Sequence, residues 1–122
     1  MNIGIVGSRS FDNYGYMVSV LTPYLKIGII DLIISGGAAG ADSLAKKFAK
    51  EHGLKYKEFK AHWNVYGKAA GYKRNVKIVD ASEMIIVFWD GSSKGTKHTI
   101  DLAKEKGKEL VICWPDKFDE IG

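Results

Sequence analysis

The chain has 122 residues, 46% of them hydrophobic, which is enough for one compact core and too few for two ordinary domains, so we expect one domain over residues 1–122. The single cysteine, Cys113, excludes an intrachain disulfide, and no apolar stretch approaches the roughly 20 residues of a membrane span, so we expect a soluble cytoplasmic protein without a membrane partner. The net charge of +4 is modest, but residues 46–77 carry ten Lys or Arg against two Glu, a balance of +8 that favours anionic ligands.

Five short apolar runs, rich in Ile and Val, alternate with amphipathic stretches along the chain. Each run is mostly continuous in hydrophobicity rather than alternating, which is typical of parallel strands buried on both faces of a sheet. The runs predict strands at residues 2–6, 31–35, 55–59, 83–88 and 109–113.

The stretches between these strands carry apolar residues at helical spacing. Such stripes occur within residues 44–49, 69–79 and 100–103, and each predicts a helix. The first connection has a stripe over residues 17–25 that contains Pro23. Because proline lacks a backbone N–H and clashes with the preceding turn, we expect that helix to kink or restart there.

This alternation predicts an α/β fold, a single Rossmann-like three-layer sandwich with a mainly parallel five-stranded sheet and helices on both faces. Periodicity does not fix the order of the strands, and we predict 3-2-1-4-5, with the reversal at strand 1. Sheets of this kind bind ligands beyond the carboxyl ends of their strands, where the order reverses. The loops after strands 1, 2 and 4 are therefore the expected site.

Those three loops, within residues 7–11, 36–42 and 89–97, are rich in Gly, Ser, Ala and Thr. Glycine lets backbone N–H groups approach a ligand closely, and the following helix N-terminus favours phosphate. The hydroxyl groups add donors or cap the helices. Three such loops at one sheet edge predict a phosphate or nucleotide site with candidate ligand-binding residues Gly7, Ser8, Arg9, Ser35, Gly36, Gly37, Gly40, Asp42, Asp90, Gly91, Ser92, Ser93, Gly95 and Thr96.

Residues 61–75 link the third strand to the next helix and combine aromatic with basic side chains. Trp63 and Tyr72 offer flat faces on which a base can stack, although the same rings also suit the role of covering the core. Nearby donors for phosphate or ribose oxygens extend the candidate site, which gains Trp63, Lys68, Arg74 and Asn75.

Standard cofactor and metal motifs are not found in the sequence. Ser35 occupies the place of the first glycine of the dinucleotide fingerprint, and no GxxxxGK[ST] motif occurs. His52, His62 and His98 stand apart, and no His and Cys cluster has zinc spacing. We therefore predict no metal and no cofactor.

Four stretches, taken in order, resemble the small single-domain YspA-like members of the SLOG superfamily. They are GSRSF at 7–11, SGGAAGADSLA at 35–45, FKAHWNVYGKAAGYKRN at 59–75 and GSSKGTKHTIDLAKEKGK at 91–108. The resemblance implies a Rossmann-like fold that binds nucleotides or nucleotide-derived signals and that forms a homodimer or higher homo-oligomer. Relatives in the superfamily include the LOG phosphoribohydrolases and the DNA-processing protein DprA.

The resemblance to LOG enzymes raises the question of N-glycosidic hydrolysis, for which those enzymes use a helix arginine and the glutamate of a GGxGTxxE motif. Arg74 resembles the arginine, but Thr99 stands where the glutamate is expected. Threonine cannot stabilise an oxocarbenium-like transition state as a carboxylate does. Asp42 and Asp90 are the remaining carboxylates of the loops, and each also suits a structural role, at a helix first turn and in a turn. Enzymatic activity stays open, with Arg74, Asp42 and Asp90 as catalytic candidates.

We favour the hypothesis that the protein binds a nucleotide-derived small molecule, as a sensor or by sequestration. The ligand would be a nucleoside phosphate, ADP-ribose or a cyclic ADP-ribose-like signal. The first alternative is a LOG-like nucleoside 5′-monophosphate phosphoribohydrolase, which predicts release of free base. The second is a DprA-like nucleic-acid-binding module that uses the basic segment 46–77 and predicts a steep salt dependence of binding.

Overall fold

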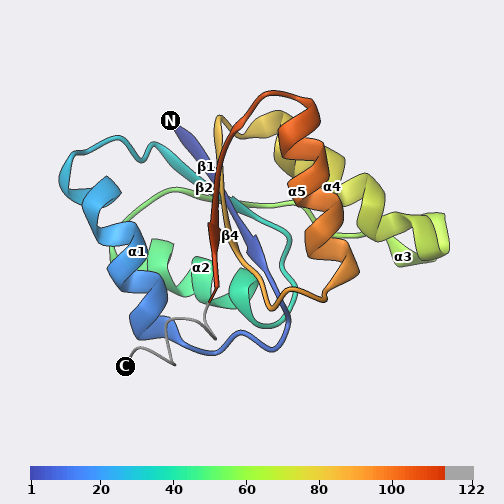
Figure 1. Cartoon of the computed structure of the whole chain (residues 1–122), viewed down its shortest axis with the longest axis horizontal. Helices are drawn as coiled ribbons and strands as arrows, with labels where there is room; N and C mark the ends of the chain where they lie inside the picture. The colour runs from blue at the N-terminus through green and yellow to red at the C-terminus, as the bar shows by residue number, and fades with distance from the viewer. Residues whose placement is uncertain (115–122) are drawn as a thin grey trace.

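The computed structural model describes residues 1–114, in which strands and helices alternate along the chain (Figure 1). The strands are β1 (Asn2–Gly7), β2 (Leu32–Ser35), β3 (Tyr56–Glu58), β4 (Met84–Phe88) and β5 (Glu109–Cys113). The helices are α1 (Tyr14–Lys26), α2 (Ala41–Glu51), α3 (Trp63–Tyr66), the 3-10 turn η1 (Gly67–Ala69), α4 (Ala70–Ala81) and α5 (Lys94–Glu105). All five predicted strands are present, with ends that differ from the prediction by no more than one residue.

The five strands form one sheet in the order β3-β2-β1-β4-β5, and all neighbouring pairs are parallel. Ile3 of β1 pairs with Ile33 of β2 on one side and with Met84 of β4 on the other. Helices α1 and α2 cover one face of the sheet, and α4 and α5 cover the other (Figure 1). The predicted α/β class and the predicted order 3-2-1-4-5 are both confirmed.

Two hydrophobic clusters, one on each face of the sheet, hold the layers together. Met17 of α1 and Phe48 of α2 belong to one cluster, whereas Ile78 of α4 and Ile100 of α5 belong to the other. All five residues of β4 are buried, because this central strand contributes side chains to both clusters in alternation. The helical stripes and the continuous apolar runs of the sequence therefore meet in the core.

Helix α1 continues through Pro23, so the restart, one of the two expected effects of this proline, does not occur. The helix runs from Tyr14 to Lys26 with Pro23 inside its last turn. Pro23 is exposed, and so is Ser19, the residue four positions earlier to which a proline cannot donate a hydrogen bond. The lost bond therefore belongs to the exposed end of the helix, while Met17 and Leu21 keep the helix packed on the sheet.

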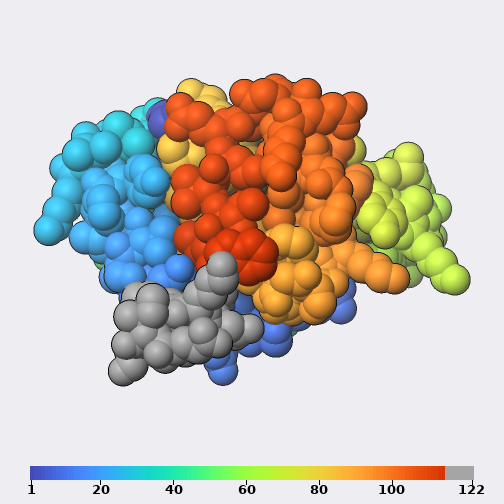
Figure 2. Space-filling view, in the orientation of Figure 1, coloured from blue at the N-terminus to red at the C-terminus, as the bar shows by residue number. Residues whose placement is uncertain are grey.

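The connection from β3 to α4 contains a short helix that the sequence did not predict. Helix α3 and η1 project from the body of the molecule beyond α4 (Figure 1 and Figure 2). Their large side chains are exposed, with Trp63 at 52%, Val65 at 72% and Tyr66 at 45%. No helix within residues 1–114 is both long and apolar enough to cross a membrane.

Candidate functional site

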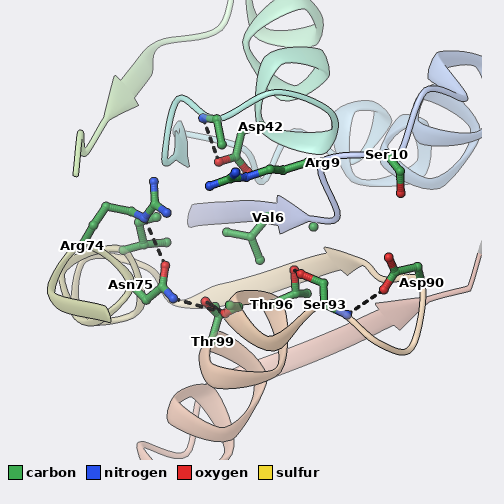
Figure 3. A pocket seen from close by; sticks show the side chains of 14 residues that line it. Val6, Arg9, Ser10, Asp42, Arg74, Asn75, Asp90, Ser93, Thr96 and Thr99 are labelled. Carbon is green, nitrogen blue, oxygen red and sulfur yellow. Dashed lines mark hydrogen bonds between the residues drawn. The ribbon is translucent and has the colours of Figure 1, made fainter. Parts of the chain in front are cut away.

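A cavity of about 390 Å³ lies beyond the carboxyl ends of β1 and β4 (Figure 3). These two strands flank the switch point, because the connections that follow them lie on opposite faces of the sheet, and open α/β sheets bind ligands at such points. The volume falls within the range of about 300–1,000 Å³ that small-molecule sites span. The cavity is lined by Val6, Gly7, Arg9, Ser10, Ala38, Asp42, Arg74, Asn75, Ile78, Asp90, Ser93, Gly95, Thr96 and Thr99.

Arg74 reaches this cavity from α4 and is fixed by two hydrogen bonds. Its Nη1 donates to the carbonyl oxygen of Gly36 at 2.9 Å, and its Nε donates to Oδ1 of Asn75 at 3.1 Å. Burial lowers the pKa of the Arg74 guanidinium, the charge of Asp42 raises it, and the charge of Arg9 lowers it. The side chain is thus a partly buried, positioned cation next to a second arginine.

Asp42, in the first turn of α2, is buried beside Arg74 and is 6% exposed. Its Oδ2 accepts the backbone N–H of Ala38 at 3.1 Å. Burial raises the pKa of the Asp42 carboxyl, and the N–H of Ala38 and the charge of Arg74 oppose that rise. Asp42 therefore combines the expected helix-start role with a place in the cavity wall.

The glycines of the β2–α2 loop (residues 36–40) allow three segments of the chain to meet. A Cβ on Gly36 would lie 2.5 Å from Nη1 of Arg74, and one on Gly37 would lie 2.5 Å from Cδ of Glu58. Gly40 has a φ of +75°, and a Cβ there would lie 2.4 Å from the carbonyl oxygens of Ser8 and Arg9. Close packing is thus sufficient reason for these glycines, independently of any ligand.

Asp90 organises the β4–α5 loop (residues 89–93). Its Oδ1 accepts the N–H of Ser92 at 2.9 Å and that of Ser93 at 2.8 Å, and these bonds lower the pKa of the carboxyl. Ser8 fixes the start of the loop, because its Oγ accepts the N–H of Asp90 at 3.0 Å. Two amides that the sequence analysis considered available to a phosphate are therefore already paired. In the first turn of α5, Gly95 and Thr96 line the cavity.

Asn75 joins α4 to α5 at the floor of the cavity (Figure 3). It is 6% exposed, and its Nδ2 donates to the carbonyl oxygen of Gly95 at 3.2 Å and lies 3.2 Å from Nδ1 of His98. Because Oδ1 of Asn75 also accepts from Arg74, this residue ties the arginine to the start of α5. We regard Asn75 as a positioning residue of the site.

A second cavity of about 360 Å³ lies on the other side of the two arginines, beyond the ends of β2 and β3. Arg9, Ala38 and Arg74 line both cavities. The remaining wall of the second cavity consists of Gly36, Gly37, Ala39, Glu58, Lys60, Ala61 and Trp63.

Comparison with known proteins places the chain in a family. A family model described as the YspA, cpYpsA-related SLOG family matches residues 1–66, more than half of the chain. The chain belongs to this family. It is also 33% identical over 88 residues to the Gene 61 protein of Mycobacterium phage D29, which covers 66% of this chain and 69% of that protein. The resemblance to SLOG proteins that the sequence motifs suggested is confirmed.

Solved structures of two DprA proteins share the fold of this SLOG chain. The structure of DNA processing protein A from Helicobacter pylori matches this chain with a TM-score of 0.71 and 19% sequence identity, over 92% of this chain and 64% of the DprA chain. That structure concerns the single-stranded DNA binding mode of the Helicobacter pylori protein. DprA from Streptococcus pneumoniae matches with a TM-score of 0.72 and 21% identity, over 91% of this chain and 49% of the DprA chain. The chain thus spans less than two thirds of either DprA chain, and the likeness concerns the fold.

Most of the candidate residues named from the SLOG-like sequence line one of the two cavities. The lining residues among them are Gly7, Arg9, Gly36, Gly37, Asp42, Trp63, Arg74, Asn75, Asp90, Ser93, Gly95 and Thr96. The others lie outside the two walls, and several have local structural roles. Oγ of Ser8 accepts the N–H of Asp90, and Oγ of Ser35 donates to the carbonyl oxygen of Ile5. The remaining four are Gly40 at the start of α2, Gly91 and Ser92 in the exposed part of the β4–α5 loop, and Lys68 in η1.

Glu58 and Lys60 were missed because the loop after strand 3 was not among the expected site loops. Their position at the carboxyl end of β3 was the available signal, since every parallel strand ends at the same edge. Ile78 was missed as well, because an apolar residue at helical spacing gives no sign that it faces a cavity. Thr99 lines the first cavity, so the residue at the expected glutamate position does face the site.

Proposed function

We propose that this protein binds a nucleotide-derived small molecule at the switch point of its sheet, as a sensor or by sequestering it. The ligand class comprises nucleoside phosphates, ADP-ribose and cyclic ADP-ribose-like signals. The observation that carries the proposal is the meeting of Arg9 and Arg74, from two separate elements, at the wall shared by both cavities (Figure 3). Paired guanidinium groups bind phosphate through charge-assisted, often bidentate hydrogen bonds.

Other parts of the wall suit the remainder of a nucleotide. Hydroxyl groups of Ser93 and Thr96, which lie 3.1 Å apart at the start of α5, can bond ribose or phosphate oxygens. The amides of the first turn of α5 add partial positive charge. Trp63, half exposed at the rim of the second cavity, offers a ring face to a base.

The first experiment incubates the purified protein with nucleoside monophosphates, NAD, ADP-ribose and its cyclic isomers, and identifies bound and free species by mass spectrometry. Retention of an intact nucleotide supports the proposal and names the ligand. Arg9→Ala and Arg74→Ala should each weaken binding by about 1–3 kcal/mol, because each removes a hydrogen bond to a charged group. Lys77→Ala, which removes an exposed cation of α4 outside both walls, is the matched control. Unchanged affinity in both arginine variants would refute this site.

The same incubation tests the phosphoribohydrolase alternative. Asp42 favours that alternative, because it is a buried carboxyl with a raised pKa in the cavity wall beside Arg74. Release of free base and ribose phosphate, abolished by Asp42→Asn, would make the protein an enzyme despite Thr99. Asp90 is less suited to catalysis, since its Oδ1 already accepts two loop amides.

Binding of single-stranded nucleic acid is the second candidate function. It is favoured by the exposed aromatic and basic surface of α3 and α4, where Nζ of Lys73 lies 4.7 Å from the centre of the Tyr66 ring. Aromatic platforms beside cations bind single strands without sequence preference. This candidate predicts oligonucleotide retardation that falls steeply with salt, and no retardation at low salt would exclude it.

The proposal includes a homodimer or higher homo-oligomer, as the SLOG resemblance implies. Two exposed apolar side chains, Ile27 at 68% and Val65 at 72%, are available for such contacts. Light scattering coupled to size-exclusion chromatography tests it, and a monomer mass at all concentrations would reject it.

A further inference from the structure

The two cavities adjoin one another and share part of their walls. Each is large enough for a nucleoside-sized group, at about 390 and 360 Å³, and each falls within the range of about 300–1,000 Å³ for small-molecule sites. Arg9, Ala38 and Arg74 line both of them. These three residues therefore lie between the two cavities, where a ligand that occupied both would contact them.

The shared wall is the cationic part of the site. Arg74 is held by the carbonyl oxygen of Gly36 and by Asn75, and Arg9 lines both cavities together with it. Within residues 1–114, no carboxylate forms a salt bridge with either guanidinium. Asp42 lies beside Arg74 and offsets part of this charge, and the positive charge that remains at the shared wall suits a bridging phosphate or pyrophosphate.

The second cavity has the features of a nucleoside subsite. A Cβ on Gly71 would lie 3.3 Å from Cη2 of Trp63 and 4.0 Å from Nη2 of Arg74, so the indole and the guanidinium approach the same point on α4. The glycine thereby lets the ring lie close to α4 beside the arginine, and stacking on such a ring recognises any base. Glu58 and Lys60 add an acceptor and a donor for ribose or base groups.

The first cavity has a different lining that also suits a nucleoside. Val6 and Ile78 form its apolar surface, and Asn75, Ser93 and Thr96 supply amide and hydroxyl groups. An apolar surface with a few convergent polar groups is the usual composition of a small-molecule site.

We infer that the ligand is a two-ended nucleotide, in which a phosphate or pyrophosphate at Arg9 and Arg74 joins one nucleoside-sized group in each cavity. This inference rests on the proposed nucleotide-binding function and narrows its ligand class. A nucleotide with one nucleoside fills only one half of the site. A two-ended ligand gains a second set of contacts without a second loss of translational freedom, and therefore binds more tightly.

The test compares ADP with diadenosine diphosphate by titration calorimetry, with the dinucleoside monophosphate ApA as a third probe for a single bridging phosphate. We expect at least one of the two-ended probes to bind at least tenfold more tightly than ADP. Trp63→Ala should abolish the tenfold preference for that probe over ADP, because it removes the ring face of the second cavity. Tyr66→Ala is the matched control, because Tyr66 is an exposed aromatic of the same helix that lines neither cavity.

The outcomes separate this inference from the function on which it rests. If ADP binds and neither two-ended probe binds more tightly, the two-ended ligand is refuted while nucleotide binding stands. If Trp63→Ala leaves the preference unchanged, the second group does not occupy this cavity and the inference is wrong. If neither ADP nor any two-ended probe binds, the proposed function fails as well. A preference for diadenosine diphosphate over ApA identifies the bridge as a pyrophosphate.

Discussion

The β2–α2 loop (residues 36–40) and the β4–α5 loop (residues 89–93) both consist largely of small residues, lie at the same sheet edge and each precede a helix. Their backbones are fixed in different ways. In the β2–α2 loop, missing side chains make room for Arg74, Glu58 and the backbone after β1. In the β4–α5 loop, one side chain, Asp90, accepts the amides of Ser92 and Ser93.

The difference shows that a glycine-rich loop need not offer its amides to a ligand. The β2–α2 loop instead contributes a carbonyl oxygen, that of Gly36, which fixes Arg74 at the junction of the two cavities. In the β4–α5 loop, Asp90 already accepts the amides of Ser92 and Ser93, so an anion would be bound by the amides in the first turn of α5. Substitutions that act on one loop and not on the other test this contrast.

The largest expected effect is on the stability of the β2–α2 loop. Gly40→Ala should lower the free energy of unfolding by about 2–5 kcal/mol, because a positive φ disfavours alanine and the Cβ meets backbone oxygens that cannot move aside. Gly91→Ala in the β4–α5 loop is the control. Its φ is +88°, but its Cβ would meet only Trp114, at 3.4 Å, so a loss of about 1–2 kcal/mol is expected. Urea unfolding measures both, and equal losses would contradict packing as the constraint on Gly40.

Gly36→Ala should act on binding more than on folding. Its φ is not positive, and the nearest atom to the new Cβ is the flexible end of Arg74, at 2.5 Å. The arginine is expected to leave the Gly36 carbonyl, which should weaken nucleotide binding by about 1–3 kcal/mol. Titration calorimetry of Gly36→Ala, Arg74→Ala and the double variant tests the route, because the second change should add nothing to the first. Additive losses would show that Gly36 acts independently of Arg74.

The acidic residues associated with the two loops should respond to pH in opposite directions. The pKa of Asp90 is lowered, so its stabilising bonds exist above its unfolded pKa of about 3.9 and are lost as pH falls through the lower folded value. The pKa of Asp42 is raised by burial, so the cost of ionising it appears as pH rises from about 3.9 through the higher folded value.

Urea unfolding between pH 3 and pH 7 checks this opposition. Asp90→Ala should be destabilised by about 0.5–2 kcal/mol at pH 7, as for the loss of a capping side chain, and the deficit should shrink toward pH 3. Asp42→Asn should gain stability relative to the unsubstituted protein as pH rises from 4 to 7. If the stability of both variants relative to the unsubstituted protein changed in the same direction with rising pH, the environments assigned to Asp42 and Asp90 would be contradicted.

Much of the fold was predictable because its signals are local. Continuous runs such as residues 83–88 need both faces buried, and stripes such as Ile100 and Ala103 need one buried face. The strand order depends on which strands exchange hydrogen bonds, and apolar runs of similar composition do not encode that choice. The order 3-2-1-4-5 was correct, but the pattern of residues alone could not have selected it.

The site was predictable in outline and not in its connections. Glycines and serines after the strands indicated the correct edge of the sheet, and Arg74 was recognised as a ligand candidate. The bond from Arg74 to Gly36 joins residues 38 positions apart, and the contact of Asn75 with Gly95 joins residues 20 apart, so neither follows from local spacing. The capture of two amides by Asp90 was local, yet the same sequence also fits a loop whose amides are free.

The smallest expected effect locates the phosphate relative to the β4–α5 loop. Gly95, the second residue of α5, lines the first cavity, and a Cβ there would meet nothing within 4 Å. Gly95→Ala should therefore raise the free energy of unfolding by about 0.4–1 kcal/mol through a less flexible unfolded chain. Gly15→Ala is the matched control, at the second residue of α1 and outside both cavities, and it should raise stability similarly.

If the amides of α5 bind phosphate, Gly95→Ala alone should weaken nucleotide binding, because the added methyl group occupies the approach to those amides. Unchanged affinity would show that the phosphate depends on Arg9 and Arg74 alone, and that the β4–α5 loop, with its amides paired to Asp90, serves only to shape the wall.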